Sequence, residues 1–536
     1  MKEMADVLTL ARQAHGAHDW ATAAAHFDAV GAERLTADDL AAYADALWWL
    51  GRVEDNLRLM AVACEAFLAD SRPADAAWVA TLLGIFHMGR GDRPQAMGWI
   101  GRAGRLLEGI PECPAHGLLL QITGVEANLQ AGDPAAAVDE ARRMQAIGNR
   151  IDETGLVVLG LNCEGRALIR AGQVVDGLAL LDEAMVAARD SRLGPFLTGS
   201  LYCHTIAFCH EVADLGRMSR WTDLTEDWLP TLSGVGVFGG LCAVHRAQLH
   251  ILRGAWEEAE RSALQVVPEL DAMRVDYAAE AWYVVGEARR LRGDPTAAQA
   301  YNEAHARGRD PQPGRALLQL QAGDPAGAAT AVHTAVTAVG DAPLRRAPLC
   351  AAAVEITIAA GRLEDAKAAT SELVEVAATY ATSGLEAMAT AARGAVLLAE
   401  GRAEEALPVL RDACRRWHEL GAAYDAASTC ALLARAYRVL GDQASADAED
   451  AQAEATYERL GAHRHRQMPP DGLSWRECEV LALVAEGRSN RQIGETLFIS
   501  DRTVARHLTN IFNKIGATSR TQAARYAVDH GLTAAR

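Results

Sequence analysis

A glycine that follows a helical run recurs along most of the chain at intervals of about 40 residues. Arg or Asp usually comes next, followed by an alanine-rich helical pattern, as in GDPAAAVDEA (132–141), GAWEEAERSA (254–263) and GRAEEALPVL (401–410). The glycines of this series are Gly51, Gly91, Gly132, Gly172, Gly216, Gly254, Gly293, Gly323, Gly361, Gly401 and Gly441. Each unit therefore indicates a helix, a short turn and a second helix. One such pair cannot bury its own apolar face, so we expect the pairs to stack into an α-solenoid that curls around a groove.

The interval shrinks between Gly293 and Gly323, where the segment GRDPQPGRA (308–316) contains Pro311 and Pro313. Proline interrupts helices. We expect a break or bend in the solenoid here; the alternative is that one helix is simply shorter.

Composition predicts an all-α fold and a cytoplasmic protein. The 536 residues are half hydrophobic but only 5% aromatic, and their aliphatic, alanine-heavy makeup favours helices over sandwiches or barrels. The N-terminus lacks a long apolar segment, and no long uncharged apolar run occurs elsewhere, so we expect a cytoplasmic protein without membrane contact. Ten cysteines, spread singly, indicate reduced, buried thiols rather than a disulfide framework.

Charge is distributed unevenly between the body and the C-terminal tail. From Asp471 onward the chain has nine Lys+Arg against seven Asp+Glu, whereas residues 1–470 have 43 against 63. Only the tail is suited to a polyanion, because phosphates would repel the acidic body. The stretch His463-Arg464-His465-Arg466 adds positive charge at the junction, either as a solvated linker or as an auxiliary phosphate contact.

The tail from Leu473 to Leu532 shows four short helical patterns separated by capping residues. Ser474 and Glu477 form a predicted capping box for a helix from about Trp475 to Gly487. Ser489 or Asn490 caps the second helix, and Ser500 caps the third. The apolar stripe of the third helix comprises Val504, Leu508, Ile511 and Ile515.

The third helix leaves a polar face free. That face collects Arg502, Ala505, Arg506, Thr509, Asn510 and Asn513, with Thr503, His507 and Lys514 on its flanks. Hydrogen-bond donors and small side chains are what a reader of DNA base edges needs. The alternative is that these helices merely continue the body, with an arginine-bearing solvated face.

Residue identities favour the DNA-binding interpretation, because the segment resembles the C-terminal DNA-binding domain of the LuxR family along its whole length. The matching residues are Leu473, Arg476, Glu477, Glu479, Val480, Leu481, Gly487, Asn490, Ile493, Leu497, Ser500, Thr503, Val504, His507, Ile511, Lys514, Gly516, Arg520, Ala523 and Gly531-Leu532. Ala505 departs from the pattern, since many relatives carry Lys there.

The resemblance implies a role for each group of residues. The third helix enters the major groove with Arg502, Arg506 and Thr509 near base edges, while Ala505 contacts at most a thymine methyl. Phosphates are met by Asn490, Arg491, Thr503 and Lys514, and Asn510 adds a donor to the same face. The fourth helix, Arg520 to His530, is the dimer contact, with Arg520, Ala523, Ala524 and Ala527. A dimer implies an operator that is an inverted repeat or nearly so.

The body resembles tetratricopeptide repeats, in the arrangement that precedes a LuxR-type domain in large regulators of the MalT type. Those regulators also carry an ATPase module. Here the only lysines, Lys2, Lys367 and Lys514, follow Met, Ala and Asn, so a P-loop is not expected. No early βαβ pattern suggests a phosphoacceptor receiver domain.

Three other motifs have a functional and a structural interpretation. Gly234, Gly236 and Gly239 spell GxGxxG, but no strand pattern precedes them, which favours an inter-helix loop over a dinucleotide site. Cys203, His204, Cys209 and His210 do not have the spacing of a metal site. The tryptophans at 48, 49, 78, 99, 221, 228, 256 and 282 could line a ligand groove, but most are expected to be packing anchors.

The sequence thus predicts a tetratricopeptide-like α-solenoid over 1–460, a linker over 461–472 and a four-helix LuxR-type helix-turn-helix domain over 473–536. The predicted function is sequence-specific DNA binding in transcription regulation, with activation implied by the resemblance alone. The expected partners are double-stranded DNA, a second copy of the chain, RNA polymerase as a further candidate, and an unknown small-molecule or protein effector on the solenoid. No cofactor, metal or enzymatic activity is expected. The alternative is an interaction scaffold with a vestigial DNA-binding tail.

Overall fold

The computed structural model describes residues 2–189, 193–234, 236–275, 277–462, 473, 475–497, 499–529 and 532. These residues form helices and connecting turns, and no β-strand occurs among them, which confirms the predicted all-α fold. No helix in this part of the chain is long and apolar enough to cross a membrane. The predicted linker over 461–472, including His463–Arg466, falls almost wholly outside the described residues.

The first part of the chain forms helical hairpins in which each helix packs chiefly against its neighbours in sequence. The N-terminal helices are α1 (Lys2–Gly16), α2 (Trp20–Val30), η1 (Ala32–Arg34), α3 (Ala37–Trp49), α4 (Val53–Ala69), α5 (Pro73–Met88) and α6 (Arg93–Leu107). They are followed by α7 (Pro114–Leu120), the π-helical turn η2 (Gln121–Glu126), α8 (Ala127–Ala131), α9 (Pro134–Arg150), α10 (Thr154–Arg170), α11 (Val174–Ala187), α12 (Pro195–Glu211), α13 (Leu215–Trp228) and η4 (Leu229–Thr231).

The hairpins continue to the end of the array. The remaining helices are α14 (Gly236–Arg253), α15 (Trp256–Met273), α16 (Tyr277–Arg292), α17 (Ala297–Ala306), α18 (Gly314–Gln321), α19 (Pro325–Val339), α20 (Pro343–Ala359), α21 (Leu363–Tyr380), α22 (Ser383–Ala399), α23 (Ala403–Glu419), α24 (Ala423–Val439) and α25 (Gln443–Leu460). The predicted interruption at 308–316 coincides with two short helices, α17 of 10 residues and α18 of 8.

The predicted turn glycines adopt the left-handed conformation that ends one helix and turns the chain into the next. Ten of the eleven have a positive φ, for example 79° at Gly132 and 80° at Gly441. Gly216 is the exception and the prediction is wrong there, because it is the second residue of α13. The left-handed position in that turn belongs to Ala213, with a φ of 52°.

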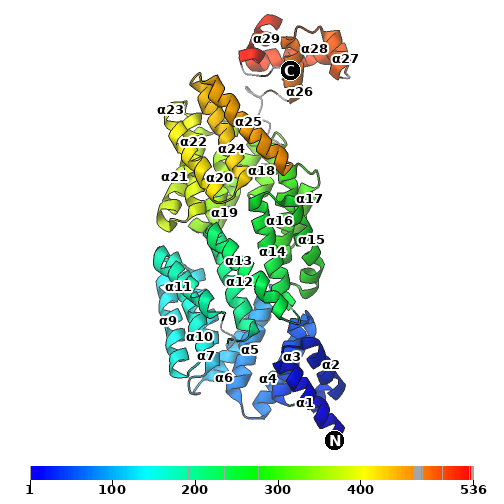
Figure 1. The fold of residues 1–536 in the computed structure, drawn as a ribbon, viewed down its shortest axis with the longest axis vertical. Coiled ribbons are helices and arrows are strands. Elements are labelled where there is room, and N and C mark those ends of the chain that lie inside the picture. The colour runs from blue at the N-terminus through cyan, green and yellow to red at the C-terminus, as the bar shows by residue number, and fades with distance from the viewer. Residues whose placement is uncertain are drawn as a thin grey trace.

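The array winds into a superhelix whose successive turns touch (Figure 1). The loop between α12 and α13 meets the loop between α21 and α22: Gly384 N donates to Ala213 O at 3.2 Å, and Thr382 Oγ1 donates to Val212 O at 2.5 Å. A shared core joins α10–α12 and the loop after α12 to α20–α22 around these contacts. Segments 170 residues apart in sequence are therefore packed together.

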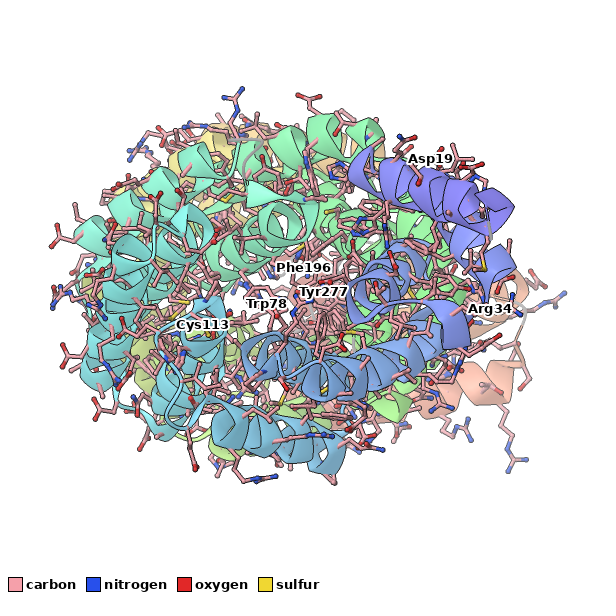
Figure 2. The ribbon with its side chains drawn as sticks, turned by 90° about the horizontal axis from the view of Figure 1, so that it is seen from below. Asp19, Arg34, Trp78, Cys113, Phe196 and Tyr277 are labelled. Carbon is pink, nitrogen blue, oxygen red and sulfur yellow. The ribbon has the colours of Figure 1, made fainter. Side chains whose placement is uncertain are left out.

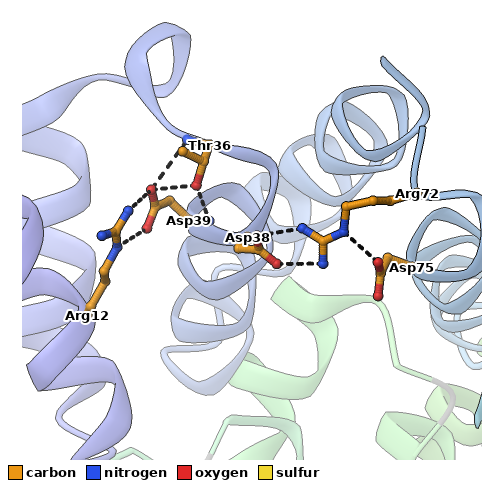
Figure 3. A network of polar contacts seen from close by, with 6 residues as sticks. All are labelled: Arg12, Thr36, Asp38, Asp39, Arg72 and Asp75. Atoms are coloured by element: carbon orange, nitrogen blue, oxygen red, sulfur yellow. Dashed lines mark hydrogen bonds and ion pairs between the residues drawn. The ribbon is translucent and has the colours of Figure 1, made fainter. Parts of the chain in front are cut away.

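Polar side chains tie the first helices together (Figure 3). Asp39 is 3% exposed and accepts two hydrogen bonds from Arg12, at 2.7 and 2.8 Å, and one from Thr36 Oγ1 at 2.7 Å. Burial raises the pKa of Asp39, but the Arg12 and Thr36 hydrogen bonds outweigh burial and hold it below its ordinary value. Arg72 bridges Asp38 and Asp75 in the same region, at 2.6 and 2.7 Å. Each of these three carboxylates is thus paired with an arginine.

Most tryptophans are packing residues, as predicted. Trp48, Trp49, Trp221 and Trp256 are buried, and Trp99, Trp228 and Trp282 are half-buried; Trp78, 39% exposed, is the exception.

The GxGxxG segment packs on the end of α3. A Cβ at Gly234 would lie 3.0 Å from Trp49 O, and one at Gly236 would lie 2.7 Å from Trp48 O. Gly236 also has a positive φ of 44° and begins α14, without a preceding strand in the described chain. These two glycines therefore allow a close backbone contact, in agreement with the inter-helix interpretation.

The described C-terminal residues form a separate helical cluster with its own core. Its helices are α26 (Trp475–Ala485), α27 (Asn490–Leu497), α28 (Asp501–Ile515) and α29 (Arg520–Asp529). The core comprises Leu473, Cys478, Val480, Leu481, Val484, Ile493, Val504, Leu508, Ile511, Ala523 and Ala527. The capping box expected from Ser474 and the predicted residues Gly531 and His530 lie outside the described residues.

Candidate nucleic-acid interface

α27 and α28 are joined by a tight turn in helix-turn-helix order. Ser489 caps α27, since its hydroxyl accepts from Gln492 N at 3.3 Å and its own N–H donates to Gln492 Oε1 at 2.9 Å. Ser500 caps α28 by accepting from Thr503 N at 3.2 Å. At Gly494 an added Cβ would lie 2.6 Å from Ile499 O, so glycine allows the close approach within the turn.

α28 buries one face and exposes the other, as its pattern predicts. Val504, Leu508 and Ile511 are buried in the domain core. The exposed residues are Arg502, Ala505, Arg506, Thr509, Asn510, Asn513 and Lys514, while Thr503 and His507 are half-buried at the flanks. The predicted base-reading residues therefore lie together on one accessible face.

The two arginines of this face are free to bind. In the part of the chain that the structure describes, no hydrogen bond or ion pair joins the guanidinium of Arg502 or Arg506 to another protein group. Thr509 Oγ1, by contrast, donates to Ala505 O at 3.1 Å. Arg502 and Arg506 thus offer the fork-shaped donors that match guanine O6 and N7.

The predicted phosphate contacts differ in their availability. Arg491 is exposed and forms only a surface ion pair with Glu495 at 3.1 Å. The side chain of Asn490 is held within the domain, because its Oδ1 accepts from Arg520 Nη1 at 2.9 Å.

Lys514 is engaged in the domain as well. Its Nζ lies 2.8 Å from Oε2 of Glu477, a residue that is only 3% exposed. The lysine side chain remains 38% exposed, so it keeps a surface toward solvent while it neutralises a buried carboxylate.

The predicted dimer contact needs a correction. Ala523 and Ala527 are 0% exposed, because α29 turns these small residues inward and packs closely against α26. Arg520 is also turned inward, toward Asn490 and the carbonyl of Arg488. Among the predicted contacts Arg520 and Ala524 keep partial exposure. The outer face of α29 presents Thr521 and Val528, the latter 61% exposed, with the half-buried Ala524 at its edge.

The cysteine–histidine motif at 203–210 does not converge on one point. Cys203 and Cys209 are buried, whereas His204 and His210 are exposed. In the described chain the side chains that do converge are Cys414, His418 and Cys430, a group that the sequence analysis missed. The spacing of Cys414 and His418, one helical turn apart, was the available signal.

Comparison with known proteins bears on the C-terminal domain. Residues 471–527 match the family model described as "Bacterial regulatory proteins, luxR family". Over 69 residues the chain is 48% identical to the transcriptional regulatory protein LiaR of Bacillus subtilis, covering 13% of this chain and 33% of LiaR. Over 64 residues it is 47% identical to the transcriptional regulatory protein DegU of Brevibacillus brevis, covering 12% of this chain and 27% of DegU.

The helical array has a distant structural neighbour. A chain in the crystal structure of the APC/C hetero-tetramer Cut9-Hcn1 overlays with a TM-score of 0.42 and 12% identity, covering 85% of this chain and 96% of that one.

The present chain spans about a third or less of the length of the two regulators, because each match is confined to 69 or 64 residues. Residues 471–527 of this chain are therefore a domain of the luxR family of bacterial regulatory proteins, which follows a long array of helical hairpins.

Proposed function

We propose that this protein is a sequence-specific, double-stranded-DNA-binding transcription regulator in which α28 enters the major groove. The observation that carries the proposal is the accessible face of α28, where Arg502 and Arg506 lie one helical turn apart without a protein partner in the described chain. A bidentate arginine–guanine contact contributes about 1–3 kcal/mol of discrimination against another base. Arg491 and the N-termini of α27 and α28 supply phosphate contacts that set the register.

The acidic array limits how the duplex can approach. Residues 1–470 carry 20 more acidic than basic side chains, whereas the tail carries two more basic than acidic ones. Phosphates are repelled by the array and attracted only to the tail. Binding should therefore weaken steeply with salt through the few cations of this domain.

We infer that two copies bind together through the outer face of α29. Thr521 and Val528 are exposed on α29 and the small, half-buried Ala524 lies between them, and an exposed valine beside small residues supports a close helix–helix contact. The operator is then an inverted repeat with half-sites about one helical turn apart. Activation of transcription, with RNA polymerase as a partner, is part of the same proposal and rests on the resemblance to LuxR-type regulators.

The inner wall of the superhelix is the proposed site of an effector. Trp78, Phe196 and Tyr277 lie near the centre of the ring of helices, whereas Asp19 and Arg34 lie at its rim (Figure 2). His204 keeps accessible surface, yet desolvation by the surrounding helices, with a contribution from Arg166, lowers its pKa to about 4. A histidine on a convex surface would stay hydrated and keep its ordinary pKa. An accessible histidine with a lowered pKa therefore supports the placement of His204 on an enclosed inner face of the superhelix.

The direct test is selection of bound duplexes from a random pool by the full chain, repeated with the fragment from Gly461 onward. Enrichment of an inverted repeat by both proteins supports the proposal. Enrichment by the fragment alone would mean that the array restrains the domain until an effector binds. No enrichment by either would favour the scaffold with a vestigial tail.

The effector site can be tested separately by a thermal-shift screen of small molecules against the wild type and Trp78→Ala. A compound that stabilises the wild type but not the variant would locate the site on the inner wall.

A further inference from the structure

Near the C-terminal end of the array, three soft metal-ligating side chains converge. Cys414 and His418 lie one turn apart on α23, and Cys430 lies on the adjacent α24. Their ligand atoms are all within 4.8 Å of one another, and the two sulfur atoms are 3.4 Å apart. A carboxylate from a third helix lies nearby, because, after Cys414, Glu449 of α25 is one of the groups that raise the pKa of Cys430.

The geometry is close to that of a tetrahedral metal site. Two thiolates at a Zn–S distance of about 2.3 Å around a tetrahedral ion are separated by roughly 3.8 Å. The two sulfur atoms, 3.4 Å apart, would need to separate only slightly to bind the ion. To form a disulfide bond of about 2.0 Å they would need to approach each other by much more. The half-buried Cys414 and the exposed His418 leave a path for an ion from solvent.

The array offers an internal comparison. The thiol of Cys242 is the first cause that raises the pKa of Cys203, so these two also form a thiol pair, but both are buried in the core of the solenoid, and no histidine or carboxylate converges on them in the described chain. The pair Cys414–Cys430 differs in having an imidazole at the solvent side and Glu449 beside it. That donor set, with two sulfur atoms, one nitrogen and one oxygen, is suited to Zn²⁺.

We propose that Cys414, His418 and Cys430 bind one zinc-class divalent ion, with Glu449 or a water molecule as the fourth ligand. The ion would join α23, α24 and α25, the last hairpins before the DNA-binding domain. Bound metal stabilises the state that presents its ligands, so this end of the array becomes more rigid when the ion is present.

The test uses the full chain, reduced and freed of metal, and Co²⁺ as a spectroscopic probe. We expect one Co²⁺ per chain, with the visible bands of tetrahedral cobalt and a thiolate-to-cobalt charge-transfer band, both removed by added Zn²⁺. Cys414→Ser and Cys430→Ser should each abolish the charge-transfer band of this site or reduce its affinity by at least about tenfold, and His418→Ala should reduce affinity by about tenfold or more.

The matched control is Cys203→Ser, which removes one thiol of the other pair and should bind Co²⁺ like the wild type. The proposal fails if the reduced wild type shows no cobalt–thiolate band, or if Cys203→Ser removes the band and Cys414→Ser does not. It also fails if the protein forms a Cys414–Cys430 disulfide in air and, after reduction, still binds no cobalt. Circular dichroism of each variant checks that loss of the band is not loss of the fold.

Discussion

Lys514 Nζ lies 2.8 Å from Glu477 Oε2, and this ion pair joins α28 to the first helix of its domain, α26. Glu477 is 3% exposed, so its charge depends on protein partners rather than on water. The lysine that the sequence assigns to phosphate contact therefore also supports α28, the helix proposed to read DNA. Its contact with phosphate stays a prediction.

Lys514→Ala should destabilise the C-terminal domain by about 1–3 kcal/mol, because a buried carboxylate loses a charged partner. Hydrogen exchange of the full chain should show faster exchange in α26 and α28 and unchanged exchange in the array. Arg491→Ala, which removes only a surface ion pair, is the control and should leave exchange unaltered. Equal protection in both variants would mean that the ion pair contributes nothing to stability.

His245 should make the array sensitive to mild acid. It is 2% exposed, and burial is the first cause that lowers its pKa to about 4. The pKa of His245 in the folded protein lies below its value of about 6.5 in the unfolded chain. Burial of the neutral imidazole therefore contributes its full stability only when the pH is above about 6.5. The contribution is lost as pH falls from about 6.5 to 4, by about 2–4 kcal/mol.

Urea unfolding at pH 7.5 and at pH 5, monitored by tryptophan fluorescence, measures this loss of stability. His245→Gln should unfold with a smaller pH dependence than the wild type, and the exposed His305→Gln should not. An unchanged pH dependence in His245→Gln would assign the acid sensitivity to other groups.

Gly236→Ala should destabilise the contact between α3 and α14. The new Cβ would lie 2.7 Å from Trp48 O at a backbone φ of 44°. Gly132→Ala is a matched control, since Gly132 also has a positive φ, of 79°, but nothing lies within 4 Å of its Cβ position. We expect a loss of about 1 kcal/mol in the control from the backbone alone and a larger loss in Gly236→Ala. Equal losses in denaturant titrations would argue against a tight contact.

The outer face of α29 provides a prediction about assembly. Val528→Glu places a charge on the exposed face and should abolish paired binding to an inverted repeat while binding to one half-site persists. Ala527→Glu instead buries a charge in the core and should unfold the domain. Gel-shift titrations of the two variants, with duplexes that carry one half-site or two, distinguish loss of pairing from loss of the folded domain. Paired binding by Val528→Glu would exclude this face as the dimer contact.

Local patterns predicted the helices and turns well because their causes are local. The glycines at positions such as Gly132 and Gly441 mark turns, since left-handed backbone favours glycine. At Gly216 the inference failed because Ala213 takes the left-handed position and Gly216 lies inside α13. The exposed face of α28 was likewise predictable from helical periodicity and the cap at Ser500.

The sequence predictions failed, or were silent, where the question was which helix surfaces pack against each other. Periodicity places Ala523 and Ala527 on one face of α29, but it does not say whether that face meets α26 or a second molecule; the structure turns it inward. The pairing of Lys514 with Glu477 joins residues 37 positions apart, without a local signal. Cys430 reaches Cys414 and His418 only because α23 and α24 form a hairpin.

The central claim is that the exposed arginines of α28 read DNA sequence. The most direct measurement is the affinity of the full chain for its selected duplex and for the same duplex with single base-pair changes, by fluorescence anisotropy at fixed salt. Arg459→Ala, an exposed arginine on α25, is the control for lost charge. We predict that Arg506→Ala loses about 1–3 kcal/mol of discrimination at one base pair of each half-site, whereas Arg459→Ala keeps full discrimination. Equal discrimination by Arg506→Ala, Arg502→Ala and the wild type would contradict the assignment of α28 as the reading helix.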